Sequence, residues 1–274
     1  MMEAVTIIIP TYNRAALLPK AIDSVLSQSY DNFELIVVDD GSDDNTAEIL
    51  SDYSNIIYLY QENRGPAAAR NCGIRAARHD LIAFLDSDDW FAADKLEIQT
   101  RAMKENPGFL ISHTDEIWYR QGKLLNQKKK HRKYGGDIFA RCLPLCAVSM
   151  STVMVRKEMF ARIGMFDESY PCCEDYEFWL RASIRHKFLK IDQPLTLKDG
   201  GRPDEVSFQY RTGMDKFRIQ ALLKLLKESE LTRNQQKLAQ EELVRKCRIY
   251  GNGCLKHGRP EEGVYFLDLA QTIS

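Results

Sequence analysis

The chain has 274 residues, of which 44% are hydrophobic and 28% are charged, and its formal net charge is −1. This balance is typical of a globular protein with a sizeable core, and a net charge near zero gives no general attraction for nucleic acid or membranes. The first residues lack the pattern of a secretion signal, and no apolar stretch reaches the roughly 18 residues of a membrane span. The seven cysteines form no CxxC pair, so we expect reduced thiols and a cytoplasmic protein.

Short apolar strands alternate with helices through the first 90 residues. The pattern predicts strands at 5–9, 34–38, 56–60 and 81–85, and helices at 15–28, 46–50 and 66–76. Uninterrupted apolar strands in this rhythm predict a Rossmann-like α/β fold, with a mostly parallel sheet and helices on both faces. Such sheets bind ligands at the carboxyl ends of their strands, so the polar residues that follow these strands should converge on one edge.

The second half of the chain is less regular and ends in helices. Strands are predicted at 109–113 and 151–155, and helices at 159–163 and 174–186. From about residue 210 the pattern is helical only, which divides the chain into a nucleotide-binding domain at 1–207 and an α-helical extension at 208–274. Residues 243–271 resemble a helical hairpin, which is weak evidence for a repeat module. This extension is a candidate surface for a partner or a second copy.

Three acids follow the last strand of the first half, in the stretch FLDSDDW at 84–90. Carboxylates at this spacing repel each other, and their oxygens suit a hard cation such as Mg²⁺ or Mn²⁺. Such a cation takes one or two protein carboxylates and completes its shell with water and substrate phosphates. The alternative interpretation is a turn in which aspartates cap the next helix. The motif by itself does not decide between the two.

Several stretches together resemble one family. TIIIPTYNRAALLPKAIDSVLSQSYDNFELIVVDDGSDDNT, ENRGPAAARNCGIRAA and LIAFLDSDDW are similar to family 2 glycosyltransferases, and so are STVMVRKEMFARIGMFDESY and CCEDYEFWLRA further on. The resemblance covers about residues 4–195. It implies the GT-A fold and a metal-dependent, inverting transfer of sugar from a nucleoside-diphosphate sugar, with UDP as the expected nucleotide. The implied acceptor is a hydroxyl of a glycan or lipid-linked molecule in bacterial surface glycan or polysaccharide synthesis.

The resemblance also assigns roles to individual residues. Asp88 would hold Mn²⁺ or Mg²⁺, Asp86 would approach the ribose or the metal shell, and Asp89 would cap a helix. Asp175 would be the general base, with Glu174 and Trp179 orienting the acceptor. Tyr12 would cover the base, Asp40 would accept the uracil imide proton, and Arg70 would reach the base carbonyl or the phosphates. The implied donor contacts are Thr11, Tyr12, Arg14, Asp40, Asn63, Gly65, Arg70, Asp86 and Ser87.

Two stretches fit the resemblance less well. Related enzymes often carry a histidine after the acceptor region, but the corresponding stretch at 198–204 has none. Its Gly200-Gly201 pair suggests a mobile lid on which Arg202 contacts diphosphate. The basic run at 128–133 is interpreted as a solvated loop, with an anionic acceptor or an acidic membrane surface at the inner face as alternatives.

Other functions remain open at this point. A sugar nucleotidyltransferase would also bind nucleotide and metal, but its glycine-rich N-terminal loop is replaced by PTYN at 10–13. No GxGxxG follows any strand, which disfavours a nicotinamide dehydrogenase. A non-catalytic sugar-nucleotide-binding protein with a partner-binding helical tail is the third alternative, and the missing histidine leaves room for it.

Overall fold

The computed structural model describes residues 3–273. Its strands form one sheet in the order β3-β2-β1-β4-β8-β6-β9-β5, and β7 pairs with β6 outside this path. The first four strands of this order are parallel and are all predicted by the sequence. They are β3 (Ile57–Tyr60), β2 (Phe33–Asp39), β1 (Val5–Thr11) and β4 (Leu81–Phe84). This half of the sheet confirms the Rossmann-like prediction.

Beyond β4 the sheet becomes mixed. β8 (Val153–Arg156) runs antiparallel to both β4 and β6 (Ile111–Arg120). β9 (Phe188–Gly200) is parallel to β6, and β5 (Asp89–Phe91) is antiparallel to β9. The short β7 (Lys123–Leu125) forms a hairpin with β6. β9 extends into the stretch predicted to be a lid, because pairing along β6 gives its polar residues strand conformation without an apolar run of their own.

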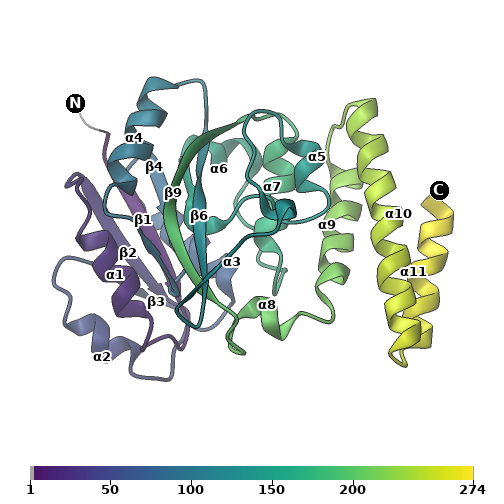
Figure 1. Ribbon diagram of the computed structural model, residues 1–274, viewed down its shortest axis with the longest axis horizontal. Coiled ribbons are helices and arrows are strands. Elements are labelled where there is room, and N and C mark those ends of the chain that lie inside the picture. Colours follow the sequence, from purple (N-terminus) through teal and green to yellow (C-terminus); the bar gives the residue numbers. More distant parts are fainter. Residues whose placement is uncertain (1–2, 274) are drawn as a thin grey trace.

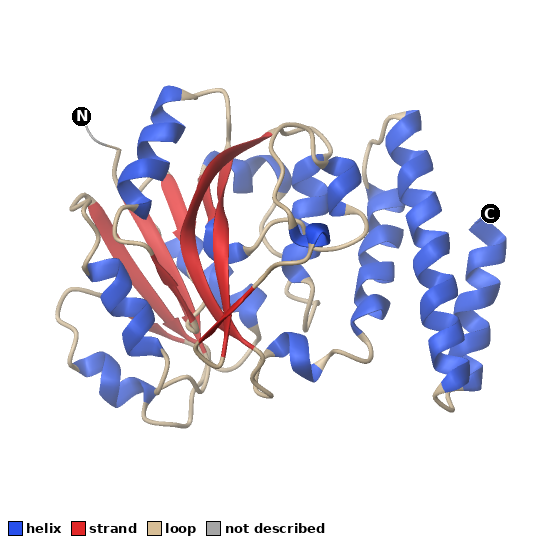
Figure 2. Cartoon of the chain, viewed as in Figure 1, coloured by secondary structure: helices blue, strands red, loops and turns tan. Residues whose placement is uncertain are grey.

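Successive residues of β1 are buried in two different cores, one on each face of the sheet. Ile7 and Ile9 pack in a cluster with α1 (Leu18–Leu26) and α4 (Lys95–Glu105). Ile8 belongs to the cluster on the other face, which includes residues of α3 (Pro66–Ala76), α6 (Glu158–Ile163) and α7 (Glu174–Ser183). Alternation of side chains along a strand explains this division. The prediction of helices on both faces is therefore confirmed (Figure 2).

Shorter elements connect this framework. They are α2 (Thr46–Ser51), α5 (Phe139–Cys142), η1 (Lys129–His131) and η2 (Met150–Thr152).

Four helices follow the sheet, and the last three stand in a row at one end of the molecule (Figure 1). They are α8 (Val206–Gln209), α9 (Met214–Glu228), α10 (Arg233–Lys256) and α11 (Pro260–Ile273). Ile219 and Leu222 of α9 share one apolar cluster with Trp179 of α7, so the extension is packed against the sheet domain through a continuous core. Within residues 3–273, no helix combines the length and the apolarity needed to cross a bilayer.

Candidate active site

A cleft of about 850 Å³ opens at the carboxyl ends of β1, β2 and β4. The loops after these strands form one wall, and the start of α7 together with the segment 198–210 forms the other. Of the thirteen residues that the sequence nominates, only Trp179 lies outside its lining. The twelve that line it are Thr11, Tyr12, Arg14, Asp40, Asn63, Gly65, Arg70, Asp86, Ser87, Asp88, Glu174 and Asp175.

Asp40 organises the loop after β3. Its Oδ1 accepts hydrogen bonds from the Gln61 side chain at 2.6 Å and the Arg64 backbone N–H at 3.0 Å, and its Oδ2 accepts from the Gly65 N–H at 2.7 Å. A carboxylate has about four acceptor positions, so one on Oδ2 stays available for a ligand donor. The fold therefore gives Asp40 a structural role that the sequence did not indicate. Its expected contact with a nucleobase stays a prediction.

The backbone approaches closely where the loops after β2 and β3 meet. Gly41 has a positive φ of +83°, and a Cβ at this position would lie 2.7 Å from the Asn63 backbone nitrogen. A larger residue would therefore be both strained and in collision with that loop. Asp39 accepts from the Ser42 N–H at 2.9 Å and from the Tyr58 hydroxyl at 3.2 Å, and these bonds support the turn after β2.

The segment after β1 presents an aromatic ring and a guanidinium to the cleft. Tyr12 is 47% exposed, so its ring is free to cover a ligand, while Thr11 is buried beside it. The Arg14 guanidinium forms an ion pair with the Asp204 carboxylate and donates to the Asp204 carbonyl oxygen at 2.8 Å. Arg14 therefore joins the wall after β1 to the segment after β9.

Asp86 and Glu174 share one arginine. The Arg70 guanidinium is buried, and it lies 2.9 Å from Asp86 Oδ1 and 2.5 Å from Glu174 Oε1. Burial opposes ionisation of Asp86, but Arg70 and Lys198 together hold the pKa of its carboxyl below the usual value. Arg70 is thus committed to two carboxylates, so its expected contact with base or phosphate would require it to leave them.

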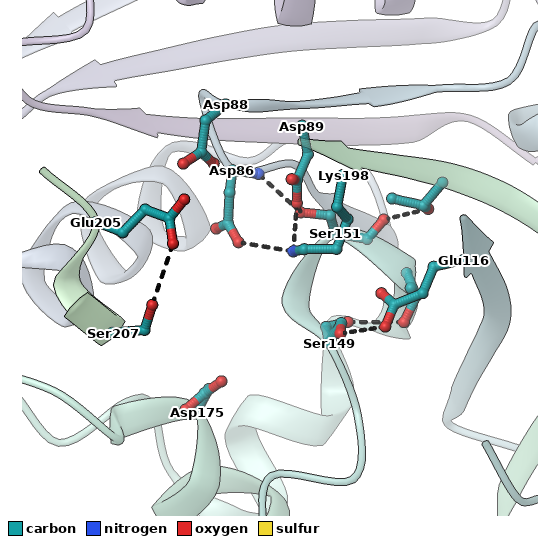
Figure 3. A network of polar contacts seen from close by, with 12 residues as sticks. Asp86, Asp88, Asp89, Glu116, Ser149, Ser151, Asp175, Lys198, Glu205 and Ser207 are labelled. Atoms are coloured by element: carbon teal, nitrogen blue, oxygen red, sulfur yellow. Dashed lines mark hydrogen bonds and ion pairs between the residues drawn. The ribbon is translucent and has the colours of Figure 1, made fainter. Parts of the chain in front are cut away.

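Lys198 is a site residue that sequence reasoning missed. It projects from β9, with its Nζ 2.5 Å from Asp89 Oδ2 and 3.8 Å from Asp86 Oδ2 (Figure 3). Burial alone would lower the pKa of Lys198, but Asp89 and Asp86 raise it well above the usual value, so the amine stays protonated. No local signal identified Lys198, because its place depends on β9 pairing with β5.

The expectation that Asp89 caps a helix is wrong. Asp89 begins β5 and is buried, and its Oδ2 accepts from the Ser151 hydroxyl at 2.6 Å as well as from Lys198. α4 begins later, after Asp94, which makes no side-chain capping bond. A buried carboxylate requires such partners, and they arrive from distant parts of the chain.

Asp88 makes its ion pair with Arg202 of the segment after β9. The two side chains are 23% and 24% exposed, so the pair is largely buried, and Asp88 lines the cleft. The cation that lies against Asp88 is therefore the Arg202 guanidinium of the chain itself, at a place where the carboxylate chemistry predicts a metal ion. Within residues 3–273, no three His, Cys, Asp or Glu side chains gather into a metal site. Asp86 and Asp88 offer one or two carboxylates, and a hard cation held in this way completes its shell with water and phosphate oxygens.

Asp175 stands across open space from Asp86 and Asp88 (Figure 3). Its Oδ2 accepts a hydrogen bond from the Cys146 thiol at 3.1 Å. Burial and the neighbouring Asp175 carboxylate raise the pKa of the Cys146 thiol well above its usual value, so it remains a donor. All seven cysteines are free thiols, as the sequence predicted.

Trp179 does not contact the cleft. It is 1% exposed and packs against Phe178 and Phe188, at 5.0 and 5.9 Å between ring centroids. The assignment of Trp179 to acceptor binding is therefore wrong for this arrangement of the chain. Its place on α7 points it into the core, four residues after Asp175, where its indole N–H has no hydrogen-bond partner among the described residues.

The basic run at 128–133 is divided between surface and interior. Lys133 is buried, and its Nζ lies 3.1 Å from Glu116 Oε1. Lys128, Lys129, Lys130 and Arg132 are exposed. None of the four lines the cleft or forms an ion pair with another residue of the described chain, which agrees with a solvated loop.

Comparison with known proteins identifies the family of the chain. The family model described as Glycosyl transferase family 2 matches residues 6–164. A protein of Haemophilus influenzae described as an uncharacterized glycosyltransferase is 46% identical over 229 residues, which is 80% of this chain and 88% of that protein. The chain spans about a third of the length of the first curated relatives that it matches, which are glycosyltransferases of Rickettsia species.

Solved structures share the fold at low identity. A crystal structure of TarS residues 1–349 from S. aureus in complex with UDP has a TM-score of 0.65 at 16% identity, covering 99% of this chain and 92% of that one. The mannosyltransferase PcManGT from Pyrobaculum calidifontis, in complex with GDP-Man and Mn²⁺, has a TM-score of 0.67 at 16% identity, covering 100% and 76%. The fold is therefore that of GT-A glycosyltransferases, and the chain belongs to glycosyltransferase family 2.

Proposed function

We propose that this chain transfers a sugar from a nucleoside-diphosphate sugar to an acceptor hydroxyl, with inversion at the anomeric carbon. The observation that carries the proposal is the placement of Asp175 across the open cleft from Asp86 and Asp88. Such a pair of walls lets a base act on one side of the anomeric carbon while a leaving diphosphate is held on the other. Attack from the side opposite the leaving group inverts the configuration.

The donor would lie along the strand ends. Tyr12 supplies an exposed ring for the base, and Asp40 keeps one acceptor position for an imide donor. Uracil has such a donor, which supports UDP as the nucleotide, and TarS is described in complex with UDP. PcManGT is described in complex with GDP-Man, so GDP is the main alternative to UDP as the donor nucleotide.

Asp88 is the residue that would hold Mn²⁺ or Mg²⁺, with Asp86 beside it. When bound, the metal supplies Lewis-acid stabilisation of the departing diphosphate. Arg70 and Lys198 keep Asp86 ionised and at the same time balance its charge, so its oxygens would act as metal ligands alongside these two cations. PcManGT is described with Mn²⁺, which agrees with this choice.

On the other wall, Asp175 would take the proton of the acceptor hydroxyl as its oxygen attacks. The Cys146 thiol donates to Asp175 Oδ2 at 3.1 Å and the Tyr176 backbone N–H donates to Oδ1 at 2.6 Å, so the carboxylate is fixed in direction while each oxygen keeps a further acceptor position. Glu174 is paired with Arg70 and is therefore a positioning residue that joins the two walls. General bases of this kind contribute about 10²–10⁴-fold to the rate.

The biological role is proposed more broadly. We infer an acceptor that is a glycan or a lipid-linked molecule, in bacterial surface glycan or polysaccharide synthesis at the cytoplasmic side of the membrane. The family and its bacterial members support this inference. Contact with a membrane surface and self-association through α10 and α11 remain parts of the proposal.

The experiment is a screen of UDP- and GDP-sugars for binding and for hydrolysis in the presence of Mn²⁺. We expect one sugar nucleotide to be consumed with release of nucleoside diphosphate, and we expect chelation or Asp88→Ala to abolish it. Asp31→Ala, at an exposed loop away from the cleft, is the matched control. Full activity in chelator would reject the metal, and release of pyrophosphate from a nucleoside triphosphate would identify a nucleotidyltransferase instead.

A further inference from the structure

A second cavity of about 320 Å³ lies beside the cleft, between the end of α8, the start of α9 and α10. Ser207, Met214 and Arg218 line both cavities, so the two are neighbours across these side chains. The side chains that matter for its chemistry are Ser207, Arg211, Thr212, Arg218 and Tyr250. The helical extension thus contributes directly to the surroundings of the cleft.

Two guanidinium groups give this cavity its character. Arg211 is exposed, stacks over the Phe208 ring at 3.9 Å and forms no ion pair with any residue of the described chain. Arg218 donates to Asp215 Oδ1 at 3.0 Å, but its Nε is buried without a hydrogen-bond partner among residues 3–273. Arg218 therefore enters the lining already paired with one carboxylate, whereas Arg211 has no acidic partner among the described residues.

The charge around the cavity favours an anion. Asp215 is the acid in its lining, and it lies near two cations, Arg218 at 3.0 Å and Lys246 at 3.4 Å. In the lining, two positive groups, Arg211 and Arg218, thus face one carboxylate, whereas Lys246 lies outside the lining and also pairs with Glu242 at 3.4 Å. Guanidinium groups recognise phosphate and carboxylate through paired, charge-assisted hydrogen bonds. The Thr212 hydroxyl adds a neutral donor to the same lining, whereas the Ser207 hydroxyl already donates to Glu205 Oε2 at 3.3 Å.

The position of the cavity separates it from the donor. Its shared residue Arg218 lies over the Tyr176 ring, 6.0 Å from guanidinium carbon to ring centroid, and Tyr176 follows Asp175 in α7. The residues nominated for the nucleotide line the cleft but not this second cavity. A molecule that reaches from Asp175 to Arg218 would therefore be the acceptor.

We propose that the second cavity binds an anionic group of the acceptor, a phosphate or a carboxylate, close to the hydroxyl that is glycosylated. The inference rests on the proposed function, because it identifies the acceptor side by Asp175. It narrows the acceptor to saccharides or polyols that carry such a group, either free or linked to a lipid. With a neutral acceptor, Arg211 would keep only its hydrogen bond to the Phe208 carbonyl oxygen at 2.7 Å and would have no anionic partner.

The test uses inorganic phosphate as the probe, titrated by calorimetry into the full chain with and without saturating UDP. Arg211→Gln changes an exposed side chain and should not affect folding, whereas Arg218→Gln is checked by its melting temperature. We expect each substitution to weaken phosphate binding about 10-fold, as the loss of a charge-assisted hydrogen bond implies. Arg248→Gln, at an exposed position of α10 outside both cavities, should leave phosphate binding unchanged.

Parallel titrations separate the sources of the anion. Acetate in place of phosphate distinguishes a carboxylate from a phosphate, and vesicles of phosphatidylglycerol against phosphatidylcholine distinguish a lipid-linked anion from a free one. Preferential binding to phosphatidylglycerol that is lost in Arg211→Gln would assign the lipid-linked form.

The outcomes distinguish this inference from the proposed function. Phosphate binding that UDP displaces, or that neither arginine variant weakens, would overturn the second cavity as an anion site while leaving sugar transfer untouched. Phosphate binding that persists with UDP bound and weakens in the variants supports it. Failure of the wild-type chain to bind any sugar nucleotide, with phosphate binding still dependent on Arg211, would overturn the proposed function and retain the anion site.

Discussion

Arg202 is expected to compete with the metal and donor for Asp88. Its guanidinium pairs with the carboxylate that would hold the cation, and it also donates to the Asp199 carbonyl oxygen. On the same segment, Asp204 pairs with Arg14 of the opposite wall. The Arg202 side chain thus lies where the metal is proposed to bind. The Asp204 side chain neutralises Arg14, a cationic residue of the wall proposed to hold the donor. Binding of metal and diphosphate therefore requires this segment to leave Asp88.

The magnitude follows from the burial of the pair. Exposed ion pairs contribute about 0–1 kcal/mol, and hydrogen bonds to charged groups contribute about 1.5–3 kcal/mol. Arg202 and Asp88 are about three-quarters buried, so we take about 1–2 kcal/mol for their contact. A ligand that must first break this contact loses that amount of affinity. Arg202→Gln should therefore tighten apparent binding of UDP with Mn²⁺ by about 5- to 30-fold.

The assay is calorimetric titration of UDP in the presence of Mn²⁺. Wild type, Arg202→Gln and Arg248→Gln are compared at one salt concentration, because screening changes the strength of exposed ion pairs. The control substitution removes an arginine of the same size from an exposed position on α10. Unchanged affinity in Arg202→Gln would refute the competition. Weaker affinity would mean that Arg202 moves onto the diphosphate and contributes more there than it costs at Asp88.

Three further outcomes can be measured. Since Asp40 keeps one acceptor position, UDP should bind more tightly than CDP by about 1–3 kcal/mol, and equal calorimetric affinities would remove Asp40 from base recognition. Asp175→Asn should lower the transfer rate about 10²–10⁴-fold with donor affinity retained, and near-normal transfer would exclude it as the base. Burial lowers the pKa of Lys95 from 10.5 to about 7, so between these values the unfolded chain binds the extra proton and stability rises with pH. Measured by denaturant unfolding, the free energy of unfolding of wild type minus that of Lys95→Met should rise by up to about 1.4 kcal/mol per pH unit in this range. A difference between the two proteins that does not change with pH would contradict this prediction.

Local sequence predicted much of the site because its residues follow strands. β-branched runs identified the strands, and the acids and polar residues after them were assigned to one edge before any contact was known. The carboxyl ends of parallel strands meet at that edge by geometry alone. Tyr12, Asp40 and Asp88 follow strands of this edge, whereas Asp175 lies in the first turn of α7 and is nominated only by the resemblance to family 2 glycosyltransferases; all four line the cleft.

What the sequence could not give is the pairing of charges across the cleft. Arg70 pairs with Asp86, 16 residues away, and with Glu174, 104 residues away, and Lys198 and Arg202 reach the acids from β9 and the segment after it. The burial of Trp179 likewise depends on how α7 packs against Phe188. The sequence by itself determined which strands end in acids, since side-chain periodicity and strand ends are local properties. Tertiary structure alone decided which cation each acid meets, because the free energy of a buried charge depends on partners that only folding brings together.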